Sequence, residues 1–184
     1  DILDRAHNAA FLHSGGIPVV FVWQMGKLNR IGWVNVLNEL AQRGKKVRLV
    51  GDASSAYGMI QWGVHDYDPN PLAPDALARH NRERMMDAKL LGSADGTGPH
   101  LYVATVSPGF DDSKLPDRTP RVTPRGSAGE RYAASWDAAF SARPDWVLIT
   151  SWNEWFEGTS IEPSVAYGDL ALRQTAEQIA RFVA

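Results

Sequence analysis

The run Ile17–Trp23 (IPVVFVW) limits most strongly what this chain can fold into. Every residue in it is apolar, so it lacks the alternation of a strand that has one face in water. A continuous apolar run of this length is typical of a strand buried on both faces, and such strands occur in parallel sheets that are covered by helices. The sequence therefore predicts an α/β fold with a parallel sheet.

Four further strand-like runs follow, and helical patterns alternate with all five. We predict strands at 17–23, 47–51, 58–64, 100–106 and 146–150, and helices at 1–14, 29–44, 73–91, 130–142 and 169–183. This alternation indicates βαβ units, in either an open sheet or a closed barrel. A polar stretch at 113–129 lies between the strand predicted at 100–106 and the helix predicted at 130–142. It is rich in Pro and Arg and is long enough to be functional.

Length sets a second limit on the architecture. The 184 residues suffice for one domain with a sizeable core, so we expect a single domain over 1–184. A complete eight-stranded barrel typically needs about 250 residues. Five strands are therefore consistent either with a compact α/β sheet or with the C-terminal part of a barrel that lacks its N-terminal strands.

Composition excludes several classes of partner. The formal net charge of −2 gives no support for a nucleic-acid partner, and no apolar run is long enough to predict a membrane span. Without cysteine the chain has no disulfide and no thiolate metal site. His65 and Asp66 lack two further ligands at metal spacing, so we expect neither a metal nor a cofactor.

The end of the last predicted strand carries the most informative residues. The apolar run 146–150 is followed by Glu154 and Glu157, with Trp152, Trp155 and Phe156 around them. In a strand, residues three apart face opposite sides, whereas in a turn they come within about 5–6 Å on one side. If the two glutamates act together, the chain must turn directly after Glu154, and Gly158 makes that turn easy.

Two carboxylates in unlike surroundings are the minimum requirement for glycoside hydrolysis, because one must accept a proton and the other must donate one. The alternative is a solvated Glu157 and a Glu154 that is paired with an Arg at the strand end. Three aromatic side chains around two acids are costly to expose without a ligand, which favours a sugar site. The candidate sugar contacts, each with core packing or turn capping as its alternative role, are Trp62, Asp111, Asn153, Trp152 and Trp155.

The order of these segments resembles glycoside hydrolase family 99, the endo-α-mannosidases, and a wider family-99-like group found beside bacterial polysaccharide genes. The stretch Ile149–Pro163 (ITSWNEWFEGTSIEP) is similar to the family signature ITSFNEWHEGTQIE, and Val106–Asp112 is similar to its VGPGY loop. Phe156 stands where the family has His, and Trp152 where it has Phe. The resemblance implies a (β/α) barrel-type, TIM-barrel-like fold, with this chain corresponding to its C-terminal five strands.

The resemblance also implies roles. It makes Glu154 the base that deprotonates the sugar 2-hydroxyl and Glu157 the general acid/base of a retaining hydrolase that acts on an α-mannoside or related glycan. A non-catalytic glycan-binding or polysaccharide-assembly protein on the same fold is the alternative, and a covalent route with Glu as nucleophile is a further one. Partners implied are the glycan and, because five strands leave an unpaired edge, either a second copy or an N-terminal portion that completes the barrel.

Overall fold

The structure is a computed structural model that describes residues 2–52 and 57–183. It separates into two compact units, which are described one at a time. The first comprises Asp1–Asp66 and Met86–Val103, and the second comprises Tyr67–Met85 and Ala104–Ala184. Strand β5 (Leu101–Val106) contributes its first half to one unit and its second half to the other.

The first unit is built on parallel strands. Strands β2 (Ile17–Val22), β3 (Arg48–Gly51) and β4 (Gly63–His65) lie in that order and continue to the first half of β5. The register pairs Val19 with Arg48, Val50 with Gly63, and Gly63 with Leu101. The unit also contains η1 (Ile2–Arg5), β1 (His13–Ser14), η2 (Met25–Lys27), α1 (Arg30–Gln42) and the end of α2 (Pro74–Leu90).

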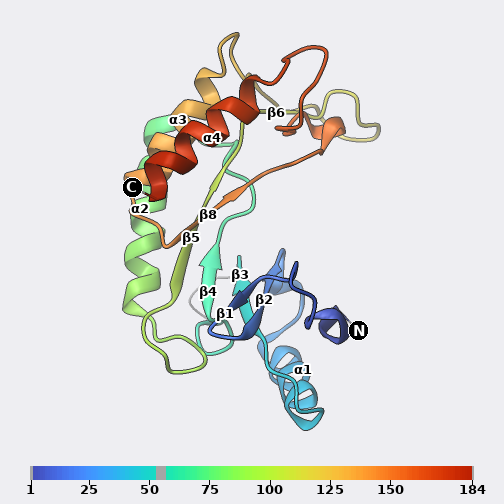
Figure 1. Ribbon diagram of the computed structural model, residues 1–184, viewed down its shortest axis with the longest axis vertical. Helices are drawn as coiled ribbons and strands as arrows, with labels where there is room; N and C mark the ends of the chain where they lie inside the picture. The colour runs from blue at the N-terminus through green and yellow to red at the C-terminus, as the bar shows by residue number, and fades with distance from the viewer. Residues whose placement is uncertain (1, 53–56, 184) are drawn as a thin grey trace. The chain divides into compact units, whose positions relative to one another are not determined.

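The core of this unit lies between the strands and α1. Met25, Leu49 and Ile60 are buried, and Trp33 and Leu37 of α1 pack against them. The helix begins at Asn29, whose side chain accepts a hydrogen bond from the N–H of Gly32 at 2.8 Å, as expected for an N-cap. Figure 1 shows α1 as the long helix that follows β2 and precedes β3.

Two predictions for this unit are wrong in detail. The helix predicted at 1–14 is not found over the described residues 2–14: within them η1 is the helical part, and β1 pairs antiparallel with the start of β2. Gly15 and Gly16 have φ values of +53° and +76°, which let the chain turn back onto the outer edge of β2. The predicted strand at 58–64 begins only at Gly63, because the N–H of Ile60 bonds to the carbonyl of Tyr57 in a turn.

The second unit contains the second half of β5, most of α2 and the chain from β6 onward. Its elements are β6 (Phe110–Asp111), β7 (Val122–Thr123), α3 (Glu130–Phe140), β8 (Trp146–Ile149), η4 (Trp155–Glu157) and α4 (Leu170–Val183). Strand β8 lies next to β5, and the N–H of Thr150 donates to the carbonyl of Val106 at 2.9 Å. Strands β6 and β7 form a short antiparallel pair.

Helices α3 and α4 pack side by side in this unit (Figure 1). Tyr132 and Trp136 of α3 are buried with ring centroids 6.0 Å apart, and the Tyr132 hydroxyl lies 2.9 Å from the hydroxyl of Thr175 on α4. All five predicted strands and four of the five predicted helices are therefore present. The structure adds three short strands, β1, β6 and β7, which the sequence pattern did not predict.

Candidate functional site

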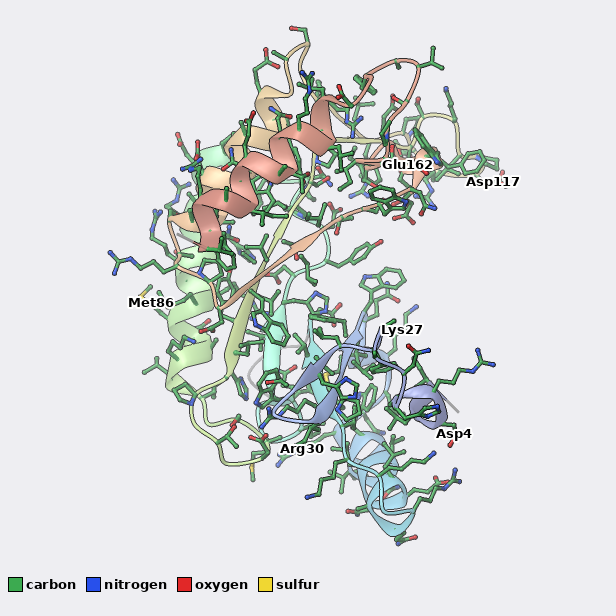
Figure 2. The ribbon with its side chains drawn as sticks, in the orientation of Figure 1. Asp4, Lys27, Arg30, Met86, Asp117 and Glu162 are labelled. Atoms are coloured by element: carbon green, nitrogen blue, oxygen red, sulfur yellow. The ribbon has the colours of Figure 1, made fainter. Side chains whose placement is uncertain are left out.

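The loop that follows β8 closes on itself through its own backbone. In this β8 exit loop (Ser151–Glu162), the N–H of Ser151 donates to the carbonyl of Thr159 at 3.0 Å, and the N–H of Ile161 donates back to Ser151 at 2.9 Å. Glu162, labelled in Figure 2, donates its N–H to the carbonyl of Trp152 at 2.9 Å. Thr159, Ser160 and Ile161 are buried, so the base of the loop is anchored in the unit.

The two glutamates lie on a tight turn at the tip of this loop. Glu154 occupies the N-cap position of the single 3-10 turn η4, and Glu157 is the last residue of that turn. Gly158 ends it with a φ of +63°, where a Cβ would lie only 3.1 Å from the backbone nitrogen of Asp111. The predicted change of direction directly after Glu154 is confirmed, and Gly158 is required both by its backbone angle and by the space around it.

Glu154 is held by groups from two segments. The Tyr67 hydroxyl donates to its Oε2 at 3.1 Å, and the Glu154 N–H donates to the Ser151 hydroxyl at 2.9 Å. Burial, followed by the charge of Glu154, raises the pKa of Tyr67 to about 12. Tyr67 therefore remains a protonated donor throughout the neutral range and orients one oxygen of the carboxylate.

Glu157 has a different environment. Its side chain is 23% exposed, and its Oε1 lies 3.5 Å from Nη1 of Arg118. Burial raises the pKa of Glu157, the negative charge of Glu154 raises it further, and Arg118 acts in the opposite direction. The charges of both glutamates also raise the pKa of Tyr67, which indicates that both carboxylates lie near this hydroxyl group.

A second loop of the same unit supplies this arginine. Asp112 is 1% exposed, and its carboxylate accepts from the backbone N–H of Arg121 at 2.6 Å and from Arg118 at 3.2 Å. The bond from the Arg121 N–H and then the Arg118 guanidinium lower the pKa of Asp112. We refer to residues 112–121 as the Asp112 loop. Its tip is exposed, and Asp117 lies at its outer edge in Figure 2.

The aromatic residues predicted to contact a sugar are on the β8 exit loop and are accessible. Trp152 is 52% exposed, Trp155 47% and Phe156 71%. Asn153 between them is also exposed, and its carbonyl accepts from the N–H of Trp155 at 2.9 Å. Large exposed aromatic side chains next to two carboxylates are unusual unless a ligand covers them.

Asp111 has the role that was given as its alternative. Its carboxylate accepts from the backbone N–H of Ser113 at 3.0 Å, which forms an Asx turn. Its own backbone nitrogen packs against Gly158, so the structure brings Asp111 beside the η4 turn. The side chain is exposed and remains a candidate sugar contact.

The structure does not support Trp62 as a sugar platform at a strand exit. Because β4 begins at Gly63, Trp62 lies directly before the amino end of that strand. The guanidinium of Arg48 covers its ring at 4.5 Å from the centroid, and Arg48 in turn pairs with Asp95 at 2.9 Å. Catalytic residues of barrel enzymes lie at the carboxyl ends of the strands, so Trp62 is at the wrong end of β4 for this role.

Sequence reasoning missed Tyr67 and Arg118. Tyr67 lies in the polar segment 66–69 directly after the buried strand β4, and this position could have drawn attention to it. Arg118 lies in an irregular Pro- and Arg-rich stretch, where no pattern distinguishes it from its neighbours.

Within residues 2–52 and 57–183, no group of three His, Asp or Glu side chains is arranged to hold a metal ion, and no helix is long and apolar enough to span a membrane.

Comparison with known proteins finds the same family that the sequence motifs resemble. Residues 87–173 match the family model described as glycosyl hydrolase family 99. A stretch of 65 residues is 42% identical to a glycoprotein endo-alpha-1,2-mannosidase-like protein of Danio rerio and 35% identical to that of Homo sapiens. These stretches cover 35% of this chain but only 15% and 14% of the two relatives.

Solved structures match over nearly the whole chain. The GH99 endo-alpha-mannosidase of Bacteroides thetaiotaomicron superimposes with a TM-score of 0.79 at 21% identity, covering 99% of this chain and 60% of that one. A second structure, described as a glycoside hydrolase-like protein, gives a TM-score of 0.65 at 20% identity over 96% of this chain and 58% of its own. The predicted resemblance to family 99 and the predicted barrel-type α/β fold class are thus confirmed.

Proposed function

We propose that this chain carries the acid–base centre of a retaining glycosidase that acts on an α-mannoside or a related glycan with a free 2-hydroxyl. The observation that carries the proposal is the pair of glutamates on the η4 turn. Glu154 is oriented by a protonated tyrosine, while burial and a neighbouring negative charge raise the pKa of Glu157. Two carboxyl groups whose environments differ in this way can take the roles of base and acid.

In the first step of the proposed reaction, the Glu154 carboxylate removes the proton of the sugar 2-hydroxyl. The 2-oxygen then attacks C1, the bond from C1 to the leaving oxygen breaks, and Glu157 donates its proton to that oxygen. The product is a 1,2-anhydro sugar. Tyr67 contributes by holding one oxygen of Glu154, which leaves the other oxygen to accept the proton.

In the second step, Glu157 has become a carboxylate and removes a proton from water. The water oxygen attacks C1, the bond from C1 to the 2-oxygen opens, and the proton on Glu154 returns to the 2-oxygen. Two inversions at C1 give net retention of configuration. A raised pKa suits Glu157, because the group must be protonated in one step and deprotonated in the next near neutral pH.

The test is a pair of substitutions in the chain as printed, assayed on a glycan with an internal α-1,2-mannosidic bond. This bond is chosen because the similar curated proteins are named endo-alpha-1,2-mannosidases. Glu154→Gln and Glu157→Gln are each expected to lower kcat about 10²–10⁴-fold, which is the usual contribution of a general acid or base. Glu177→Gln on the exposed face of α4 makes the same chemical change away from the site and is expected to keep full activity.

The corresponding glycosyl fluoride separates the two roles. Fluoride needs little protonation on departure, so Glu157→Gln should recover most of the lost first-step rate, whereas Glu154→Gln should stay inactive. Equal losses for both variants on both substrates would contradict the separate roles. Mass spectrometry that finds a covalent glycosyl adduct on either glutamate would replace the anhydro-sugar route with the covalent one.

A non-catalytic glycan-binding protein is the second candidate, and the exposed aromatic residues favour it. Trp152, Trp155 and Phe156 offer apolar surface for the C–H faces of a sugar whether or not a bond is cut. On this hypothesis the same glycan binds without turnover, and Glu154→Gln and Glu157→Gln leave its affinity nearly unchanged. Isothermal titration together with product analysis of the same samples distinguishes binding from hydrolysis.

A further inference from the structure

One arginine atom lies between the candidate acid and a buried carboxylate. Nη1 of Arg118 is 3.5 Å from Oε1 of Glu157 and 3.2 Å from Oδ2 of Asp112. Asp112 is buried and is also held by the backbone N–H of Arg121, so it provides a fixed anchor for the guanidinium. The Asp112 loop thereby reaches Glu157 through the side chain of Arg118.

Glu157 faces charged and titratable groups from three segments. Glu154 precedes it on the same turn, Tyr67 and Asp68 come from the segment after β4, and Arg118 comes from the Asp112 loop. Burial and the two negative neighbours favour the protonated form of Glu157, whereas Arg118 favours the carboxylate. Arg118 therefore opposes the other influences on the proton of Glu157.

We propose that Arg118 is a positioning residue that holds the Glu157 carboxyl group in place and sets the pH range over which it exchanges its proton. The catalytic meaning of this assignment rests on the proposed function. The physical contact does not, because the interaction between Arg118 and Glu157 exists whether or not the chain turns over a glycan. For that reason the two parts of the proposal are tested by different measurements.

The first measurement follows Glu157 itself. In the full chain with ¹³C-labelled glutamate, the Glu157 carboxyl signal is assigned by its loss in Glu157→Gln and is then titrated by NMR. Arg118→Met removes the cation and keeps an apolar stem, so the pKa of Glu157 should rise. Opposite charges at this distance lower the pKa of a carboxyl group by about one to three units, and because Arg118 is 46% exposed, solvent reduces the expected rise to about half to one unit.

Arg121→Met is the matched control. Arg121 is in the same loop, is 54% exposed and also pairs with acidic groups, namely Asp68 at 3.3 Å and Asp112 at 4.0 Å. Its substitution removes the same charge without removing the contact with Glu157. The titration of Glu157 should therefore move clearly less in Arg121→Met than in Arg118→Met. Arg118→Lys keeps a positive charge on a shorter side chain that lacks the guanidinium fork, and it should give an intermediate pKa for Glu157.

The second measurement is the pH profile of kcat on the internal α-1,2-mannoside. A general acid loses activity as the pH rises through its pKa, so Arg118→Met should move the alkaline limb to higher pH by the same half to one unit as the NMR titration, with KM little changed. A purely structural role for Arg118 would instead lower kcat at every pH and leave the limb in place.

An unchanged Glu157 titration in folded Arg118→Met, or an equal shift in Arg121→Met, would overturn the proposal. If Arg118→Met fails to fold, Arg118→Lys is the deciding variant. The proposal then requires that the pKa of Glu157 in Arg118→Lys be higher than in the unsubstituted chain. If no variant or parent chain hydrolyses the glycan while the NMR shift is found, the contact is established and the proposed function is what fails.

Discussion

The two loops that meet at Glu157 are built in different ways. The β8 exit loop (Ser151–Glu162) is closed by backbone hydrogen bonds between its own ends, and its base is buried. The Asp112 loop is closed at its base by Asp112 and Arg121, and its remaining residues are largely exposed. Both loops are closed by backbone hydrogen bonds, since the N–H of Asp112 also donates to the carbonyl of Arg121 at 3.3 Å, and the Asp112 loop adds a buried carboxylate with its donors.

This difference separates two functions of an acid–base site, namely positioning the carboxylates and setting the pKa of the acid. The β8 exit loop fixes where Glu154 and Glu157 lie. It does so through backbone hydrogen bonds, which contain no titratable group. The loop held by Asp112 brings in Arg118, whose guanidinium acts on Glu157 by its charge and by hydrogen bonding. Because the β8 exit loop positions the backbone of both glutamates and Arg118 supplies the neighbouring charge, the pKa of Glu157 can be tuned without moving that backbone.

Gly158→Ala should have the largest effect on stability, because Gly158 ends the η4 turn and lies against Asp111 of β6. A φ of +63° costs a non-glycine residue about 1–2 kcal/mol, and the new Cβ would press on the backbone nitrogen of Asp111 at 3.1 Å. We expect a total loss of about 1–3 kcal/mol, measured by urea unfolding of the whole chain. Gly16→Ala, at a similar φ of +76° but with open space around it, is the control for the backbone angle and should cost less.

Ser151→Ala tests the β8 exit loop alone. The Ser151 hydroxyl accepts from the Glu154 N–H at 2.9 Å and lies 2.8 Å from the Thr159 hydroxyl. Its loss should cost about 0.5–1.5 kcal/mol of unfolding free energy, the usual net contribution of a hydrogen bond. If the loop is held mainly by its backbone, as we conclude, the Glu157 titration should stay within experimental error of the parent chain. A large shift of that titration in Ser151→Ala would show that the loop depends on its side chains after all.

Asp112→Asn should have the smallest effect on stability, and the effect should depend on pH. Because its pKa is lowered in the folded chain, Asp112 contributes stability above its unfolded value of about 3.9, and that contribution is lost as the pH falls through the folded value. The unfolding midpoints of the parent and Asp112→Asn should therefore differ at pH 7 and converge below about pH 4. A difference that stays constant from pH 7 to pH 3 would mean that the charge of Asp112 does not hold this loop.

Local patterns were sufficient for most of the fold and for the centre of the site. The strand-like runs located the five strands, with the start of β4 misplaced, and the spacing of the two glutamates before Gly158 indicated the turn that the structure shows as η4. Both are short-range properties, because a buried strand and a tight turn are each encoded within a few residues. The errors arose where longer-range pairing decided the outcome. Residues 13–14 pair with β2 and do not form part of a helix, and Trp62 precedes its strand and does not end it.

What only the tertiary structure decided is the set of partners around the two carboxylates. Tyr67 bonds to Glu154 across 87 positions of sequence, and Arg118 reaches Glu157 from an exposed loop with no periodicity. Such contacts depend on which strand ends and loops the fold brings together, and no local pattern records that information. The sequence by itself therefore determined that two acids share a turn at the end of β8. Their separate environments, and with them the distinct roles proposed for base and acid, follow from residues that only folding places beside them.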